Sequence, residues 1–247
     1  MVSVVVTCYN REKYIVDAIS SVVSQTYKNW ELVIVDDGST DKSLEVIKKL
    51  IKIFKIKDKI KIIKHDKNEG CGSALRDAIN HSSGDLIAIL DSDDTLASKA
   101  LEIMVSQHKN NSNASLCYSN MVYCDHKLKP IKKRRTRQIK RYESCFNDKT
   151  DIVTHLKVFK KRFYDETEGI SEGIIKSIDK DLIFKLEEVG SLIHVDAYLY
   201  NYRQHKNSML SIINRDLHYK KMAYKSKTKV YDDTRKRRQN NSSNILL

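Results

Sequence analysis

The chain has 247 residues, of which 40% are hydrophobic and 31% are charged, a balance that excludes a fibrous repeat or disorder over most of its length. The longest apolar runs, such as residues 86–90, fall far short of the ~20 residues that a membrane-spanning helix needs. Residues 2–7 lack the basic start of a signal peptide, and the five cysteines form no Cys-x-x-Cys pair. We therefore expect a cytoplasmic protein without a disulfide framework or a zinc ribbon.

The net charge of +13 is unevenly distributed along the chain. Residues 127–141 contain nine lysines and arginines and no acid, and residues 215–238 contain ten with three acids. Two such basic stretches indicate a polyanionic partner or an anionic membrane surface. A polyanion- or nucleic-acid-binding protein is therefore one hypothesis, although neither stretch shows a known nucleic-acid motif or the interleaved aromatic residues of a single-strand platform.

The first part of the sequence alternates between apolar, β-branched runs and amphipathic segments. Asn10 is placed to cap the first expected helix, and Thr40 and Asp41 to cap the second. Short buried strands that alternate with helices predict a parallel α/β sheet with right-handed crossovers. The expected strands cover residues 2–7, 30–35, 60–63 and 86–90, and the expected helices cover residues 12–24, 44–50 and 73–79.

Beyond residue 95 this alternation becomes looser. Residues 127–141 are expected to form an exposed hairpin or loop. After Asn214 we expect a basic helix, followed by a polar, disordered tail over residues 239–244. The other expected helices cover residues 99–107, 151–158 and 182–189, and the other expected strands cover residues 115–123, 192–195 and 198–202.

Polar clusters follow three of the expected strands, at the end of an open parallel sheet where ligands bind. They cover residues 7–10, 36–41 and 91–94. The second cluster is also explained by a turn followed by a helix cap. In the third, three acids directly after an apolar strand repel one another unless a cation lies among them, and such hard oxygen ligands suit Mg²⁺ or Mn²⁺. A solvated helix start is the alternative for this third cluster.

A series of segments also follows the order and spacing of a known family. These segments are residues 2–10, 21–27, 31–41, 68–70, 90–94, 179–190 and 200–209. Together they resemble the family 2 glycosyltransferases, which have the GT-A fold, over about residues 2–210. Ile178 stands where a glutamate is common in the family. This difference, together with the sequence of residues 155–159, makes the second half most similar to bacterial glycosaminoglycan-type polymerase modules.

The resemblance implies a single GT-A domain over residues 1–213, with a Rossmann-like, mixed and mainly parallel sheet flanked by helices. Residues 1–95 would form its nucleotide-sugar-binding half and residues 96–213 its acceptor-binding half, followed by the basic helix and tail of residues 214–247. The implied reaction is an inverting, metal-dependent transfer of a sugar from a nucleotide sugar to a hydroxyl of a glycan or lipid-linked acceptor in surface polysaccharide synthesis. The expected donor is a UDP-sugar. At the inner face of the membrane, residues 215–238 would make a peripheral contact with anionic lipid.

The resemblance also implies roles for single residues. Asp179 would be the general base, although the missing glutamate at position 178 leaves Asp181 as the alternative. Asp93 and His205 would bind Mn²⁺ or Mg²⁺. From the residues alone, Asp179 is better explained as a helix cap and His205 as a surface histidine. The implied nucleotide-binding residues are Thr7, Tyr9, Asp36, Ser39 and Asp91.

A third hypothesis is a nucleotidyltransferase on a similar sheet. Such an enzyme would need a glycine-rich phosphate loop after the first strand, and residues 7–11 contain no glycine. The glycosyltransferase is therefore the favoured hypothesis, and we expect no nucleic acid as a partner.

Overall fold

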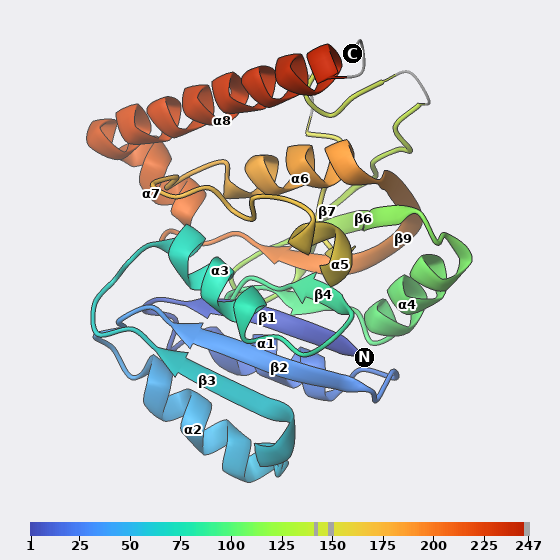
Figure 1. The fold of residues 1–247 in the computed structure, drawn as a ribbon. Coiled ribbons are helices and arrows are strands. Elements are labelled where there is room, and N and C mark those ends of the chain that lie inside the picture. The colour runs from blue at the N-terminus through green and yellow to red at the C-terminus, as the bar shows by residue number, and fades with distance from the viewer. Residues whose placement is uncertain (141–142, 148–150, 245–247) are drawn as a thin grey trace.

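The computed structural model describes residues 1–140, 143–147 and 151–244. Its strands are β1 (Val2–Cys8), β2 (Trp30–Asp36), β3 (Ile60–Lys64), β4 (Leu86–Ile89), β5 (Thr95–Leu96), β6 (Ala114–Cys124), β7 (Pro130–Arg134), β8 (Lys157–Lys160) and β9 (Ser191–Arg203). They form one mixed sheet in the order β3-β2-β1-β4-β8-β6-β9-β5, with β7 paired to β6 (Figure 1). The strands from β3 to β4 in this order are parallel, as are β6 and β9, whereas β8 is antiparallel to both of its neighbours.

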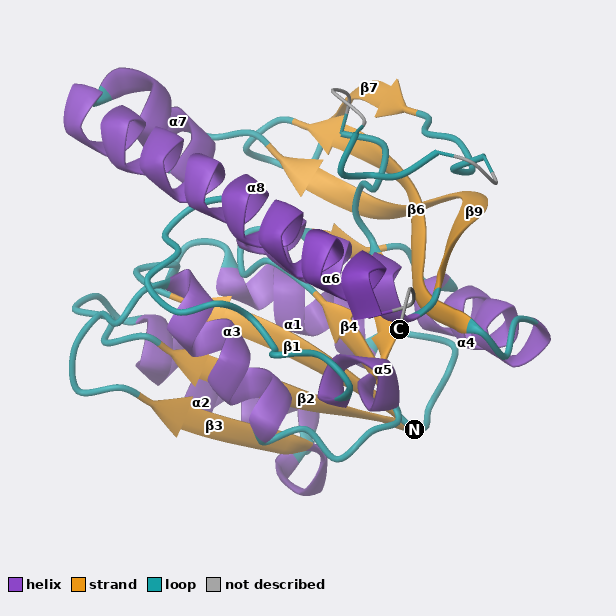
Figure 2. Cartoon of the chain, turned by 45° about the horizontal axis from the view of Figure 1, so that its top comes forward, coloured by secondary structure: helices purple, strands orange, loops and turns teal. Residues whose placement is uncertain are grey.

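Helices cover both faces of this sheet (Figure 2). They are α1 (Ile15–Val23), α2 (Ser43–Phe54), the 3₁₀ helix η1 (Lys57–Lys59), α3 (Cys71–Asn80), α4 (Ala100–Asn110), α5 (Lys161–Asp165), α6 (Ile178–Val189), α7 (Met209–Arg215) and α8 (Leu217–Asn244). One hydrophobic core joins α1, α2 and α4 to one face, and a second joins α3, α5, α6 and α8 to the other. Strand β1 contributes side chains to both cores. Val4 and Val6 belong to the first core and Val5 belongs to the second, because successive side chains of a strand point to opposite faces. The predicted mixed α/β sheet flanked by helices is confirmed.

Residues 151–158 do not form the predicted helix. Strand β8 begins at Lys157 and lies antiparallel between β4 and β6. Its side chains alternate between the two cores, with Val158 in the first and Phe159 in the second. Residues 151–156 form neither a helix nor a strand. Residues 157 and 158 belong to β8 because two strands from distant parts of the chain supply its hydrogen bonds, and local periodicity does not show those strands.

Two further expectations differ from the structure near the C-terminus. The strands predicted at residues 192–195 and 198–202 are one strand, β9, whose register against β6 shifts beside Asn120. The tail predicted to be disordered over residues 239–244 continues α8 as far as Asn244, and residues 245–247 lie outside the described chain. The predicted hairpin is present, since β7 pairs antiparallel with β6, but residue 141 is outside the described residues.

Asn10 does not cap α1, which begins five residues later at Ile15. Its φ of 53° lies in the left-handed region, which asparagine tolerates better than most residues. Its Oδ1 accepts the backbone N–H groups of Thr40 at 2.8 Å and of Asp41 at 3.3 Å. Asn10 therefore ties the loop after β1 to the loop after β2, while Asp41 accepts the backbone N–H of Ser43 at the start of α2, as a cap would.

Helix α8 lies over α6 on the outer side of the second core (Figure 1). Val230 anchors it there, since its side chain is fully buried. In the N-terminal part of α8, Leu217, Tyr219 and Tyr224 are exposed. No helix in residues 1–140, 143–147 and 151–244 is both long and apolar enough to cross a membrane.

Candidate active site

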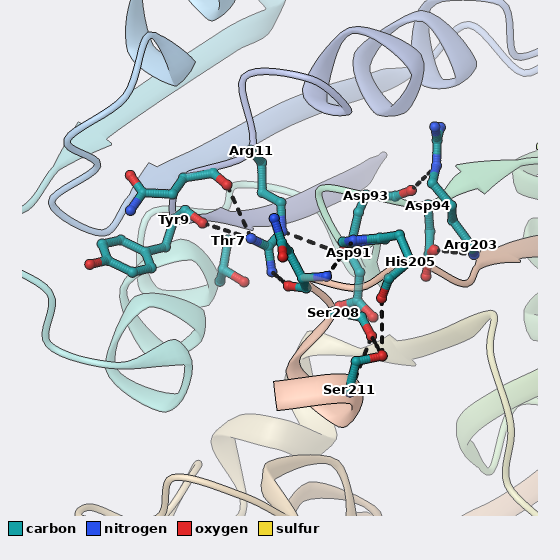
Figure 3. Close-up of polar contacts among 12 residues, drawn as sticks. Thr7, Tyr9, Arg11, Asp91, Asp93, Asp94, Arg203, His205, Ser208 and Ser211 are labelled. Carbon is teal, nitrogen blue, oxygen red and sulfur yellow. Dashed lines mark hydrogen bonds and ion pairs between the residues drawn. The ribbon is translucent and has the colours of Figure 1, made fainter. Parts of the chain in front are cut away.

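The carboxyl ends of β1, β2 and β4 meet at one edge of the sheet, because β1 is the parallel neighbour of both other strands. Thr7, Asp36 and Asp91 therefore lie at neighbouring strand ends. Strand β9 reaches the same place, since the hydroxyl of Tyr200 accepts the backbone N–H of Asp91 at 3.1 Å. Figure 3 shows how side chains from the ends of β1, β4 and β9 converge. The polar clusters that the sequence analysis singled out thus form one site.

Asp36 is the most unusual residue on the β2 side of this site. It is completely buried, and neither of its carboxylate oxygens has a hydrogen-bond partner in the described part of the chain. A buried carboxylate without donors is costly, so its position indicates a ligand that donates hydrogen bonds. Thr7 is half-buried, Tyr9 is 41% exposed, and Ser39 accepts the backbone N–H of Asn10 at 3.0 Å through Oγ.

A histidine that the sequence analysis missed supports the loop beside Asp36. His65 follows β3 directly, with Nδ1 2.8 Å from Asp37 and Nε2 2.9 Å from Asp77. Burial lowers the pKa of His65, but the hydrogen bonds to these two carboxylates outweigh burial and raise the pKa above its ordinary value. Asp37 also accepts the backbone N–H groups of Glu69 and Gly70, so it positions the loop before α3.

Among the residues described, His65, Glu69 and Asp77 are also the only group of three histidine, cysteine or acidic residues whose ligand atoms lie within 4.8 Å of one another. His65 also contacts Asp37, which accepts the backbone N–H groups of Glu69 and Gly70. We therefore assign this group to holding the loop.

The acids that follow β4 have different partners. Oδ2 of Asp93 lies 2.9 Å from Nε2 of His205 and 3.2 Å from Nε of Arg11 (Figure 3). Burial would raise the pKa of Asp93, but the hydrogen bond to His205 and the charge of Arg11 outweigh burial and hold the pKa below its ordinary value. Burial and then the charge of Asp93 raise the pKa of Asp91 above its ordinary value. This part of the site therefore carries acids that repel each other.

Asp93 and His205 fit a divalent cation. Their side chains are only 15% and 2% exposed, and a carboxylate with an imidazole is a donor pair that suits Mn²⁺. A cation here would also offset the repulsion between Asp91 and Asp93. Arg203 holds the loop in shape, since its Nε donates to the carbonyl of Asp93 at 2.7 Å. The sequence analysis missed Arg11 as a member of this site, although it directly follows the polar cluster after β1.

Asp179 lies at the start of α6. It is exposed in the first turn of α6 and lines a small hollow together with Asp151 and Ile152. After burial and Asp93, the charge of Asp179 also raises the pKa of Asp91. Cys71 lies beside Thr7, with Sγ 3.6 Å from Oγ1, and its thiol pKa is raised to about 11 by burial and then by the charges of three aspartates, one of which is Asp179. Asp179 is thus near the acids that follow β4.

Asp181, the alternative base, is engaged inside the protein. It is 1% exposed and accepts hydrogen bonds from the backbone N–H of Ser171 at 2.7 Å and from its hydroxyl at 2.9 Å. It also forms an ion pair with Lys185 at 3.2 Å. Of the two aspartates, only Asp179 presents an exposed carboxylate.

The fold is that of the GT-A glycosyltransferases. Residues 1–349 of TarS from S. aureus, solved in complex with UDP-GlcNAc, match with a TM-score of 0.68 over 91% of this chain and 71% of that one, at 19% identity. The mannosyltransferase PcManGT from Pyrobaculum calidifontis, solved in complex with GDP-Man and Mn²⁺, matches with a TM-score of 0.65 over 84% of this chain and 58% of that one, at 17% identity. At these identities the likeness shows the fold alone.

The chain belongs to glycosyltransferase family 2. The sequence model described as Glycosyl transferase family 2 matches residues 3–167. The chain is also 31% identical over 201 residues to chondroitin synthase from Escherichia coli. That match covers 81% of this chain and 28% of that protein, so the chain spans little more than a quarter of this relative's length. The predicted resemblance to the family and to glycosaminoglycan polymerase modules is confirmed.

Proposed function

We propose that this chain catalyses the inverting transfer of a sugar from a nucleotide sugar to a hydroxyl of a glycan or lipid-linked acceptor. The proposed donor is a UDP-sugar. The observation that carries the proposal is the buried carboxylate of Asp36, which has no hydrogen-bond partner in the described part of the chain and lies at the end of β2, beside the end of β1. The Asp93–His205 pair and the exposed Asp179, whose charge acts on Asp91, support the proposal. The reaction would serve surface polysaccharide synthesis at the cytoplasmic face of the membrane.

The donor would bind along the ends of β1, β2 and β4. Asp36 accepts hydrogen bonds from N–H or O–H groups of the base or ribose, which gives its buried oxygens the donors that the described residues do not supply. The nucleotide complexes of the two solved structures with this fold support a nucleotide-sugar donor. The residues proposed to hold the nucleotide are Thr7, Tyr9, Asp36, Ser39 and Asp91.

Asp93 and His205 would hold Mn²⁺ or Mg²⁺. When bound, such an ion neutralises charge that develops on the leaving nucleoside diphosphate. Arg11, 3.2 Å from Asp93, places a guanidinium at the same position and can donate hydrogen bonds to a phosphate oxygen. These three side chains would therefore fix the diphosphate and leave its bond to the sugar exposed to attack.

Asp179 would act as the general base. Its carboxylate accepts the proton of the acceptor hydroxyl while the hydroxyl oxygen attacks the anomeric carbon. The bond from that carbon to the diphosphate oxygen breaks on the opposite side, so the anomeric configuration inverts. The adjacent cation of Lys180 is paired with Asp151 at 2.8 Å and does not neutralise this carboxylate directly.

The parts of the chain would divide this work. Residues 1–95 would bind the donor, residues 96–213 would bind the acceptor, and residues 214–247 would attach the protein to its membrane. The exposed Leu217, Tyr219 and Tyr224 of α8 stand among several lysines, a combination that favours peripheral contact with anionic lipid.

A polyanion- or nucleic-acid-binding protein is the less favoured function. Within the second basic stretch, Arg237 pairs with Glu188 at 3.2 Å and Arg238 pairs with Glu187 at 2.7 Å. Glutamates of the protein itself therefore neutralise part of this positive charge. The alternative also leaves the family match and the unpartnered Asp36 without an explanation.

Thermal unfolding with UDP, GDP, CDP and dTDP, each with and without Mn²⁺, tests the proposal. A nucleotide at 100 times its dissociation constant stabilises by about 2.7 kcal/mol, which raises the melting temperature by about 5 °C or more for a chain of this size. We expect UDP with Mn²⁺ to give this shift, and Asp36→Ala to abolish it without lowering the melting temperature of the free protein. Asp66→Ala, an exposed aspartate after β3, is the matched control. No shift with any of the four nucleotides would contradict the proposal.

A further inference from the structure

The start of α1 contacts the end of β9 and the loop that follows it. Tyr14 immediately precedes α1, and its ring centroid lies 4.3 Å from that of His205, with the two ring planes tilted by 37°. The guanidinium of Arg203 also lies over the Tyr14 ring, 4.8 Å from its centroid. Asp17, in the first turn of α1, accepts a hydrogen bond from Nη2 of Arg203 at 2.6 Å. The start of α1 therefore contacts both Arg203 and the imidazole of the proposed metal site.

Core packing does not account for Tyr14. It is half-buried, and it is part of neither hydrophobic core that the described residues form, although the next residue, Ile15, lies in the first core. Its ring contacts an imidazole and a guanidinium instead. A cation is attracted to the electron-rich face of an aromatic ring, and aromatic rings stack on one another. The position of Tyr14 thus indicates that its ring holds these two groups in place.

His205 needs such support because of where it lies in the chain. It stands between β9 and α7, in a segment that is neither helix nor strand. The hydroxyl of Ser211 donates to its backbone carbonyl at 3.0 Å (Figure 3), which fixes the backbone but leaves the side chain able to rotate. An imidazole binds a cation well only while its nitrogen stays aimed at the ion, and contacts outside the ligand set supply that orientation.

A second contact to the His205 ring depends on its protonation. The backbone N–H of Asn207 donates to Nδ1 at 3.3 Å, which requires Nδ1 to carry no proton. A neutral imidazole that binds a cation through Nε2 carries its proton on Nδ1, so it cannot accept this hydrogen bond. Stacking on Tyr14 does not depend on which nitrogen carries the proton. Of these two contacts, only the one with Tyr14 can therefore orient the ring while a cation is bound.

From these contacts we propose that Tyr14 is a positioning residue of the metal site, whose ring keeps Nε2 of His205 aimed at the cation that Asp93 also binds. The inference rests on the proposed function, because it concerns the metal site of that reaction. Arg203 connects the two members of the metal pair, since its Nε donates to the carbonyl of Asp93 at 2.7 Å while its guanidinium lies over Tyr14. Tyr14 acts through His205 and binds neither the substrate nor the cation itself.

Binding of Mn²⁺ to the full chain tests this inference. The affinity is measured in the presence of UDP, from the electron paramagnetic resonance signal of free Mn²⁺. Tyr14→Leu removes the ring and keeps an apolar side chain, and we expect it to weaken Mn²⁺ binding about tenfold. Tyr14→Phe keeps the ring and should bind Mn²⁺ like the unaltered chain. The matched control, Tyr27→Leu, alters a half-buried tyrosine that packs against the first core, so it should lower the melting temperature and leave the Mn²⁺ affinity unchanged.

A double variant shows whether Tyr14 acts through His205. If it does, Tyr14→Leu combined with His205→Ala should lose no more Mn²⁺ affinity than His205→Ala alone, because no imidazole is left to position. Losses that add would show that Tyr14 acts through another group and would overturn the inference.

Three other results would overturn the inference. They are unchanged Mn²⁺ affinity in Tyr14→Leu, a loss in Tyr14→Phe as large as in Tyr14→Leu, and an equal loss in Tyr27→Leu. If His205→Ala still weakens Mn²⁺ binding in that case, the inference alone fails and the proposed function stands. Absence of Mn²⁺ binding by the unaltered chain would refute the metal site and the inference with it, and a thermal shift with UDP alone would then show that the donor site remains.

Discussion

Replacing Asp181 with asparagine should destabilise the protein strongly. Asp181 and Lys185 form an ion pair in which the side chains are 1% and 2% exposed. The change leaves the ammonium of Lys185 with the neutral oxygens of Gly169 at 2.6 Å and Ser171 at 2.7 Å. Removing one partner of a buried ion pair costs about 3–5 kcal/mol. Since 1 kcal/mol changes the melting temperature of such a chain by about 2–4 °C, the melting temperature should fall by about 6–20 °C.

Replacing Asp179 with asparagine should lower turnover and leave the stability of the protein almost unchanged. Asp179 is exposed, and its Oδ1 accepts the backbone N–H of Lys180 at 3.0 Å, which an asparagine oxygen can also accept. The free energy of unfolding should therefore change by less than about 0.5 kcal/mol. Loss of the proton acceptor should lower turnover by about 10²–10⁴-fold. Thermal circular dichroism and a UDP-release assay measure the two effects.

Two results would refute this reasoning. A stable, inactive Asp181→Asn together with an active Asp179→Asn would place the base two residues further along α6. Early melting of Asp179→Asn would show that its carboxylate has a structural role. Binding of UDP with Mn²⁺ by both variants is the control, because it separates loss of the base from damage to the donor site.

Three other predictions concern the metal site, the loop histidine and α8. Asp93→Ala should abolish Mn²⁺-dependent UDP binding and His205→Ala should weaken it; undiminished calorimetric binding by Asp93→Ala would exclude this metal site. Two aspartates raise the folded-state pKa of His65. The stability that protonated His65 contributes to the protein is therefore complete below the unfolded-state pKa of about 6.5, and it is lost as pH rises through the folded-state pKa. The stability difference between the unaltered chain and His65→Gln, measured by urea unfolding, should therefore shrink with rising pH, and a constant difference would contradict the assignment. Replacing three exposed lysines of α8 with glutamine should reduce sedimentation with anionic vesicles at low salt, since each is worth about 1 kcal/mol near such a surface; equal sedimentation would exclude α8 from membrane contact. The three are Lys220, Lys221 and Lys225.

Local sequence signals were sufficient to place the residues that we propose bind the donor. Strands β1 and β2 are apolar runs buried on both faces, and such runs are visible without knowledge of their neighbours. The polar residues that follow these strands lie at the carboxyl edge because parallel strands end at the same edge. The resemblance to family 2 then pointed to Asp36 and Asp91 before any contact was known.

The tertiary structure alone decided which distant groups meet. Asp93 and His205 are separated by 112 residues and come together because β5, which follows Asp93 closely, pairs with β9, which ends shortly before His205. β8 exists as a strand only between its two neighbours, so its first two residues were assigned to a helix over residues 151–158.

The orientation of α6 follows the same principle. Asp179 and Asp181 are equally polar in the sequence, yet packing of α6 turns Asp181 toward Ser171 and Lys185 and leaves Asp179 exposed. Composition and periodicity determine which segments are apolar and where strands end. Whether an acid of α6 is buried or exposed depends on the segments against which the helix packs, and only the folded structure shows that packing.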